Sequence, residues 1–263
     1  MPDPVIAPPT RLGPLRPLHV HVLGSSAAVL VEPNHGPRDA GTYGEQLSVV
    51  LTDAGIPTVV THHGTWFGRI CDVLEQYERA VRDYYPDVLV INFGVAECQS
   101  NVLPTWFVRH ATTWHRTSRR GTQFYRGWLM PLVWRSLRGY QRVAGRRDQI
   151  TYRLRPARFV ADMTRTIDLT RKDCGSLVLL LDIDPPGPRL EHWLPGTGRR
   201  ATDYNRILGE IAGRYDDTVR LVRASDHLTD LAAQLPDGLH RSPAGHAITA
   251  ALLAGEITSW LGR

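Results

Sequence analysis

The chain has 263 residues, of which 42% are hydrophobic, so it is long enough to bury a sizeable core. The sequence contains no run of about 18 apolar residues, so no transmembrane helix is expected. Its three cysteines are odd in number and widely spaced, which argues against a disulfide framework and favours a reducing cytoplasm.

The net charge of +5 hides an uneven distribution along the chain. Residues 104–158 contain 13 arginines, no lysine and one acidic residue, Asp148, which is a net charge of +12. The remaining residues carry 18 basic and 25 acidic side chains, a net charge of −7. A mildly acidic body therefore carries one strongly basic segment.

The first 17 residues are rich in proline and lack the apolar stretch of a signal peptide. We expect them to form a flexible lead-in to one domain over residues 18–263. Short apolar or β-branched runs predict strands, and helically spaced apolar residues predict helices between them. The expected strands are 18–24, 57–62, 87–93, 176–183 and 219–224, and the expected helices are 43–54, 69–84, 156–171, 201–214 and 243–261. This alternation predicts an α/β fold with a doubly wound, flavodoxin-like parallel sheet of five strands.

Functional groups of such sheets gather outside the carboxyl ends of the strands. The first strand stops at Gly24, which lets the backbone turn sharply and presents Ser25 and Ser26. Taken singly, these serines are also good helix caps, and Asp237 and His240 are ordinary turn residues. Because a serine, an acid and a histidine are expected at the same edge, their joint occurrence favours acyl transfer.

Four short motifs occur at the expected strand ends: Gly24-x-Ser26, Gly64, Gly94-x-x-Glu97 and Asp237-x-x-His240. In this order they resemble the blocks of the SGNH (GDSL-type) serine hydrolase superfamily. The most specific match is PDGLHRSPAGHAI at 236–248, which resembles that family's final block. The resemblance implies that Ser26 is the nucleophile, that His240 is its base and that Asp237 orients the imidazole. It also implies that the backbone N–H groups of Ser26 and Gly64 belong to an oxyanion hole.

Two positions depart from the family pattern. Ser25 stands where aspartate is common, and Ala96 stands where the family has an asparagine that donates to the oxyanion. Losing one such donor costs about 2.7–4 kcal/mol, or about 10²–10³ in rate. Either another side chain replaces the donor, or the acyl group is an activated thioester, or catalysis is lost and the protein only binds. The candidate replacement donors are Asn92, Gln99, Asn101, His62 and His63.

The oxyanion and substrate-binding positions expected from the resemblance are Gly64, Gly94, Ala96, Glu97, His63 and Ser25. Glu97 is expected to be a polar rim residue or a partner of a nearby arginine or histidine, and Cys98 a small buried hydrophobe. No phosphate-binding loop motif occurs, and His62, His63 and His192 lack a zinc-site spacing, so neither a cofactor nor a metal is expected.

The basic segment is expected to be a helical insertion over residues 104–155, after the third strand. It contains four of the seven tryptophans. Helical spacing predicts helices over 105–114 and 122–145, which we expect to form a lid or side wall beside the crevice outside the carboxyl ends of the strands. Three uses fit a lid of this kind: recognition of an anionic or carrier-bound acyl donor, contact with an anionic membrane, or a structural lid and dimer contact. Nucleic acid is not expected as a partner, because no nucleic-acid motif accompanies the basic residues.

These observations favour a cytoplasmic serine esterase, thioesterase or acyltransferase that acts on a small or medium acyl substrate. One alternative is a catalytically silent SGNH-like binding or scaffold protein, which Ala96 favours. Another is a peripheral membrane lipid esterase.

Overall fold

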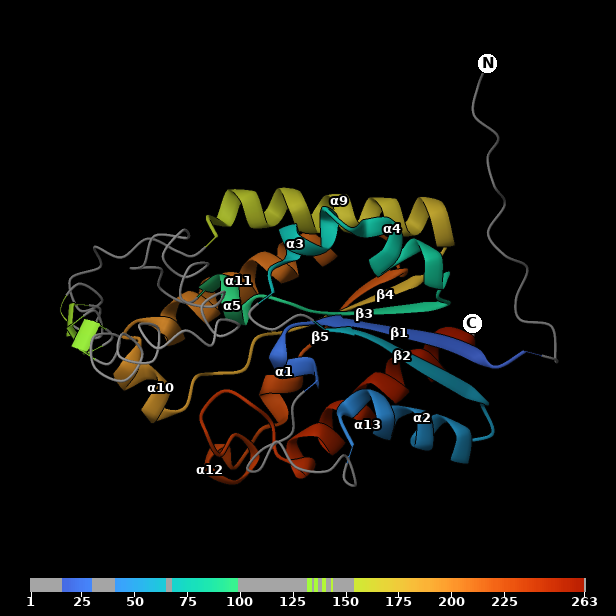
Figure 1. Ribbon diagram of the computed structural model, residues 1–263. Helices are drawn as coiled ribbons and strands as arrows, with labels where there is room; N and C mark the ends of the chain where they lie inside the picture. Colours follow the sequence, from blue (N-terminus) through green and yellow to red (C-terminus); the bar gives the residue numbers. More distant parts are fainter. Residues whose placement is uncertain are drawn as a thin grey trace, which may run out of the picture.

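The computed structural model describes residues 16–29, 41–64, 68–98 and 154–262, together with a few residues between 132 and 143. Within these ranges the chain forms one parallel five-stranded sheet with the order β2-β1-β3-β4-β5, flanked by helices on both faces (Figure 1). The expected doubly wound α/β fold is thereby confirmed. The strands are β1 (Leu18–Gly24), β2 (Thr58–Gly64), β3 (Val88–Asn92), β4 (Leu177–Leu181) and β5 (Val219–Val222).

The two central strands β3 and β4 are buried along their whole length. Their sequences, VLVIN and LVLLL, are nearly continuous apolar runs, as expected for parallel strands that are covered on both faces. Alternate residues serve different layers: Leu89 and Ile91 pack into one core cluster, and Val88 and Val90 into the other.

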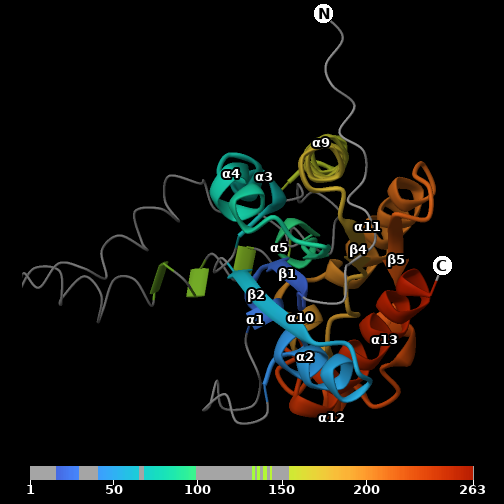
Figure 2. The ribbon, with the colours of Figure 1, turned by 90° about the vertical axis from the view of Figure 1, so that its right-hand side faces the viewer.

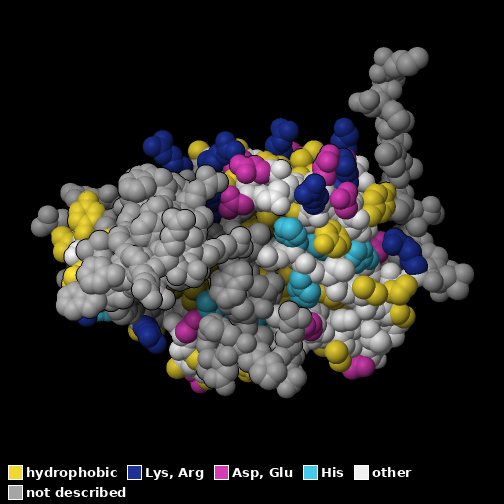
Figure 3. All heavy atoms as spheres, viewed as in Figure 1, with side chains coloured by type: hydrophobic (Ala, Val, Ile, Leu, Met, Phe, Trp, Pro, Cys, Tyr) yellow, Lys and Arg dark blue, Asp and Glu magenta, His cyan; other side chains and the backbone are white. Residues whose placement is uncertain are grey.

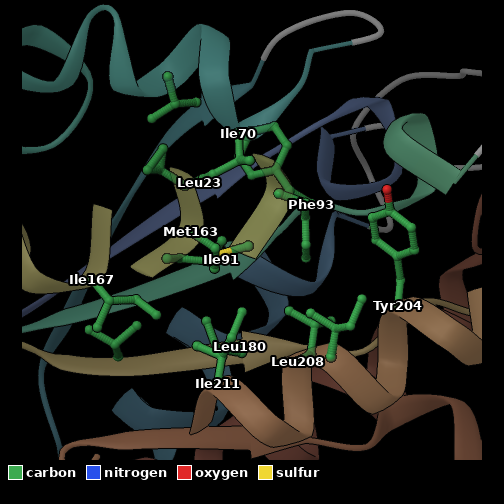
Figure 4. Close-up of a cluster of buried hydrophobic side chains, with 14 of the residues drawn as sticks. Leu23, Ile70, Ile91, Phe93, Met163, Ile167, Leu180, Tyr204, Leu208 and Ile211 are labelled. Atoms are coloured by element: carbon green, nitrogen blue, oxygen red, sulfur yellow. The ribbon is translucent and has the colours of Figure 1, made fainter. Parts of the chain in front are cut away.

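The helices form two layers, which Figure 2 shows from the end of the sheet. One layer contains α3 (Ile70–Leu74), α4 (Tyr77–Ala80), α9 (Pro156–Cys174) and α11 (Thr197–Ala212), and the other contains α2 (Tyr43–Asp53) and α13 (Pro243–Leu261). Figure 4 shows the core between the sheet and the first layer. Ile91 of β3 and Phe93, just after β3, belong to the same cluster as Met163 of α9 and Tyr204 of α11.

Local sequence signals explain where the long helices begin and end. Helix α9 has Pro156 at its first position and stops at Gly175, whose φ of 67° is left-handed. Helix α13 begins with Ser242 as N-cap, followed by Pro243, and it spans the predicted 243–261.

The prediction of one helix over 69–84 is wrong. The chain leaves helical geometry at Gln76, and it forms α3, α4 and the 3₁₀-helix η2 (Arg82–Tyr84). The carbonyl of Ala80 accepts a hydrogen bond from His21 Nε2 at 2.8 Å. The carbonyl of Ala80, the last residue of α4, therefore bonds to a side chain of β1 and not to a further helical turn.

Among the described residues, four further short helices were not predicted, because segments of four to six residues show too little periodicity. They are α1 (Ser26–Val29), α5 (Val95–Cys98), α10 (Pro188–Trp193) and α12 (Leu231–Gln234), and a 3₁₀-helix, η5 (Ala224–His227), follows β5. Helices α1, α5 and α10 lie at the end of the sheet where the strands terminate (Figure 1). The connections after β1 and β3 therefore begin with a helical turn in the described part of the chain.

Most of the predicted basic insertion over 104–155 and most of the lead-in over 1–17 fall outside the described residues. The few described residues between 132 and 143 are helical, and Tyr140 among them is exposed. The backbone N–H of Leu154 donates to the carbonyl of Glu97 at 3.4 Å, so the chain returns to the end of α5 just before α9 begins. Among the described residues, no helix combines the length and the apolar character needed to cross a membrane.

Candidate active site

Ser26 lies at the first position of α1, directly beyond the carboxyl end of β1. Its Oγ lies 3.0 Å from Nε2 of His240, which is 214 residues further along the chain. Ser26 is partly exposed, whereas Ser25 is buried in the turn. The turn requires Gly24, because a β-carbon there would lie 2.3 Å from Cβ of Ala28. The local geometry thus presents Ser26, and not Ser25, to His240.

Asp237 holds the other nitrogen of the imidazole. His240 Nδ1 lies 2.6 Å from Asp237 Oδ2, while Oδ1 accepts the backbone N–H groups of Leu239 and His240 at 2.8 and 2.7 Å. The tight turn needs Gly238, whose φ is 82°. One turn of four residues, Asp237–His240, therefore provides both the carboxylate and the ring that it orients.

The charge of Asp237 decides where the imidazole carries its proton. Burial raises the pKa of the Asp237 carboxyl, but the hydrogen bonds from the His240 ring and from the backbone of His240 and Leu239 outweigh it and bring the pKa to about 2. Because an ionised carboxylate only accepts, Nδ1 donates to it, and the Nε2 lone pair of neutral His240 faces the Ser26 hydroxyl. The arrangement can withdraw a proton from Ser26 Oγ.

Glu97 does not lie at the rim, which was one of the two places expected for it. Its side chain is fully buried, and its carboxylate accepts the backbone N–H of Ile70 at 2.8 Å and that of Gly94 at 2.9 Å. The buried Glu97 side chain therefore joins the turn after β3 to the start of α3. Gly94 donates its N–H to Glu97, and its φ of 130° lies in the region that favours glycine.

The structure places the candidate oxyanion residues at different depths. Gly64 ends β2 and lies in register with Gly24 on β1. Ala96 is buried in α5, and its methyl group donates no hydrogen bond. Cys98 is buried, as predicted, and burial raises its pKa to about 12.

Two of the candidate replacement donors point toward α2. Asn92 Nδ2 donates to the Tyr43 hydroxyl at 3.3 Å, and the His62 ring packs against Gly44. His63 follows His62 on β2 and so faces the opposite side of the sheet, where it is partly exposed. Its role as a replacement donor stays a prediction. Gln99 and Asn101 lie outside the described residues.

Beside the Asp237 turn lies a small cavity of about 10 Å³. Its lining is mainly apolar and includes Val95, Ile183, Leu190 and Leu239. A cavity of this size has room for about one water molecule, so it offers no space for an acyl chain.

Sequence reasoning missed three residues that support the His240 turn: Asp184, Gly187 and Arg241. Arg241 is buried and pairs with Asp184, and Gly187 bonds to the backbone of Gly238. The sequence signal for Arg241 was a charged residue directly after His240 and just before helix α13, one face of which is buried.

No protein-family model matches the chain, and no curated protein matches it in sequence. Solved structures do match. A lipase/acylhydrolase from Enterococcus faecalis is 14% identical, with a TM-score of 0.62, over 92% of this chain and 96% of that chain. The acetylxylan esterase Axe2 from Geobacillus stearothermophilus is 16% identical, with a TM-score of 0.57, over 91% and 94%. The acetyl xylan esterase AlAXEase is 18% identical, with a TM-score of 0.57, over 91% and 100%.

Two further matches are described as catalytic mutants of Axe2, one with a serine and one with a histidine changed to alanine. At these identities the likeness concerns the fold. The chain has the SGNH hydrolase fold, the architecture of these lipase, acylhydrolase and acetylxylan esterase structures.

Proposed function

We propose that the protein is a serine-dependent ester or thioester hydrolase or acyltransferase, with Ser26 as nucleophile, His240 as base and Asp237 as the residue that orients it. One observation carries the proposal: hydrogen-bond contacts run from Ser26 Oγ through both ring nitrogens of His240 to Asp237, at 3.0 and 2.6 Å. A helix cap or a turn histidine would not need this alignment.

The chemistry follows from these contacts. Ser26 Oγ attacks the acyl carbonyl carbon while His240 Nε2 takes the hydroxyl proton. The carbonyl oxygen becomes an oxyanion, and Asp237 stabilises the imidazolium without taking its proton. When the oxyanion collapses, the bond to the leaving alcohol or thiol breaks and His240 gives that group the proton. Water or an acceptor hydroxyl then attacks the acyl-Ser26 ester by the same route, which gives hydrolysis or transfer.

The oxyanion would be held by the backbone N–H groups of Ser26 and Gly64. Ala96 supplies no third donor, and a missing donor costs about 10²–10³ in rate. A site with two donors suits an activated acyl group such as a thioester, whose carbonyl needs less stabilisation. The same feature favours the alternative that the protein binds acyl ligands without turning them over.

A fluorophosphonate separates the two functions, because it reacts only with an activated serine. Intact mass should show one adduct on the wild type and on Ser25→Ala, and none on Ser26→Ala. His240→Ala should label at least about 10³-fold more slowly. Ser25→Ala is the matched control, since it removes the neighbouring hydroxyl. A folded wild type that takes no adduct would favour the binding function, and labelling of Ser26→Ala would exclude Ser26 as the nucleophile.

Acyl transfer is tested on the same protein with a nitrophenyl ester and a series of alcohols. Turnover that rises with alcohol concentration, with formation of the new ester, indicates transfer. Turnover that is independent of the alcohol indicates hydrolysis.

A further inference from the structure

The residue that follows His240 is an arginine with a buried side chain. Arg241 is 2% exposed, and its guanidinium forms a bidentate pair with Asp184, from Nε to Oδ2 at 2.8 Å and from Nη2 to Oδ1 at 2.6 Å. Its Nη1 donates to Thr249 Oγ1 at 2.6 Å. The side chain therefore joins the His240 turn to the loop after β4 and to α13.

The backbone that presents Asp184 is itself fixed. Asp182 accepts the backbone N–H of Ser225 at 3.2 Å. The side chain of Asn205 bonds Ile183 on both sides, because its Oδ1 accepts the Ile183 N–H at 2.7 Å and its Nδ2 donates to the Ile183 carbonyl at 2.9 Å. Asp184 is thus a fixed point to which Arg241 is bound.

A second link joins the same loop to the middle of the turn, at Gly238. The N–H of Gly187 donates to the carbonyl of Gly238 at 2.9 Å. The turn that carries Asp237 and His240 is therefore held to the loop after β4 through Gly238, inside the turn, and through Arg241, just beyond it. The Ser26–His240 contact depends on where this turn lies.

Stability alone is a weak reason for such a pair. A buried ion pair is commonly no more stabilising than apolar residues of similar volume, although removing one partner alone is costly. A bidentate contact does fix both distance and direction. A pair of this kind next to His240 therefore suits positioning better than stabilisation.

We propose that Arg241 and Asp184 are positioning residues that hold the His240 imidazole against Ser26 Oγ. This inference rests on the proposed function. Because the buried Arg241 side chain is bound to Asp184, the backbone of the neighbouring His240 is held in place. The imidazole therefore starts from a fixed position from which it reaches Ser26. A displacement of about 1 Å at such a position costs about 10²-fold in rate.

The test removes the pair as a unit, with Arg241→Met and Asp184→Leu in one protein, so that no buried charge is left alone. The control removes the ion pair between Arg220 of β5 and Glu256 of α13, which lie 2.8 Å apart, through Arg220→Met and Glu256→Leu. Fluorophosphonate labelling rates per folded molecule should fall about 10- to 100-fold in the first variant and stay at the wild-type value in the control. With a nitrophenyl ester, kcat should fall while KM is unchanged.

A folded Arg241→Met/Asp184→Leu protein that labels at the wild-type rate would overturn the positioning role. If this variant does not fold, Arg241→Lys replaces it, because lysine keeps the charge but loses the fork that binds both carboxylate oxygens. It should label more slowly than the wild type, and an unchanged rate would overturn the inference. A wild type that takes no label overturns the proposed function itself, which is a different result.

Discussion

A β-carbon on Gly187 would lie 2.5 Å from Cα of Gly238, so the loop after β4 and the turn that carries Asp237 touch through their backbones. Gly187 has an ordinary φ of −64°, and alanine would therefore cause no backbone strain there. The contact itself excludes any side chain. The two glycines set the distance between the loop and the turn.

Gly187→Ala is expected to push the turn away from the loop and to lower the rate of fluorophosphonate labelling about 10-fold or more. The matched control is Gly255→Ala in α13, where a β-carbon would meet nothing within 4 Å. The control should label at the wild-type rate. Equal labelling of all three proteins would show that the turn tolerates the displacement.

Ala96→Asn is expected to raise turnover of a nitrophenyl ester, by up to about 10²-fold, because it restores a side-chain donor beside the oxyanion. Ala96→Leu is the control, since leucine has the same branched arrangement of four side-chain heavy atoms and no donor. A gain with asparagine and a loss with leucine would identify a donor effect. No gain with asparagine would mean that another group already donates there.

The fold was predictable from sequence because β3 and β4 are uninterrupted apolar runs and the helices carry clear end signals. The Asp237–His240 pair was predictable because it is local, within one turn. Gly24, which ends β1, indicated both Ser25 and Ser26, and the resemblance to the SGNH blocks selected Ser26. These features depend on short stretches of sequence.

Glu97 and Arg241 could not be placed in the same way. Charged residues are rarely fully buried, so composition alone puts both on the surface. Their burial depends on partners far along the chain: the N–H of Ile70 for Glu97, and Asp184 for Arg241. The end of α4 also involves a residue far along the chain, because the carbonyl of Ala80 accepts a hydrogen bond from His21.

Glu97→Gln is expected to destabilise the protein by about 1–3 kcal/mol, because an amide offers one acceptor oxygen where the carboxylate serves two N–H groups. Urea unfolding measures this as a lower midpoint. The control is Glu210→Gln, at an exposed ion pair with Arg206, which should change stability by about 1 kcal/mol or less. Equal effects of the two substitutions would contradict the role assigned to Glu97.

The stability of the fold is expected to fall as the pH drops from about 6.5 to about 4, because His21 is buried as a neutral group. Burial lowers the pKa of His21 to about 4, with smaller contributions from His19, His62 and His63. Its Nε2 donates to the Ala80 carbonyl, so the neutral ring has Nδ1 free to accept from the Thr61 hydroxyl at 2.7 Å. A second proton on the ring would remove that acceptor.

Between these pH values the unfolded chain binds a proton at His21 and the folded chain does not. The free energy of unfolding therefore rises with pH across this window, by about 3 kcal/mol for a shift of this size, and the stabilisation is complete above about pH 6.5. Urea unfolding at pH 7 and pH 4 spans this window and measures the difference. His21→Gln should unfold more easily at pH 7 but lose most of the pH dependence. A variant that keeps the wild-type slope would assign the dependence to other groups.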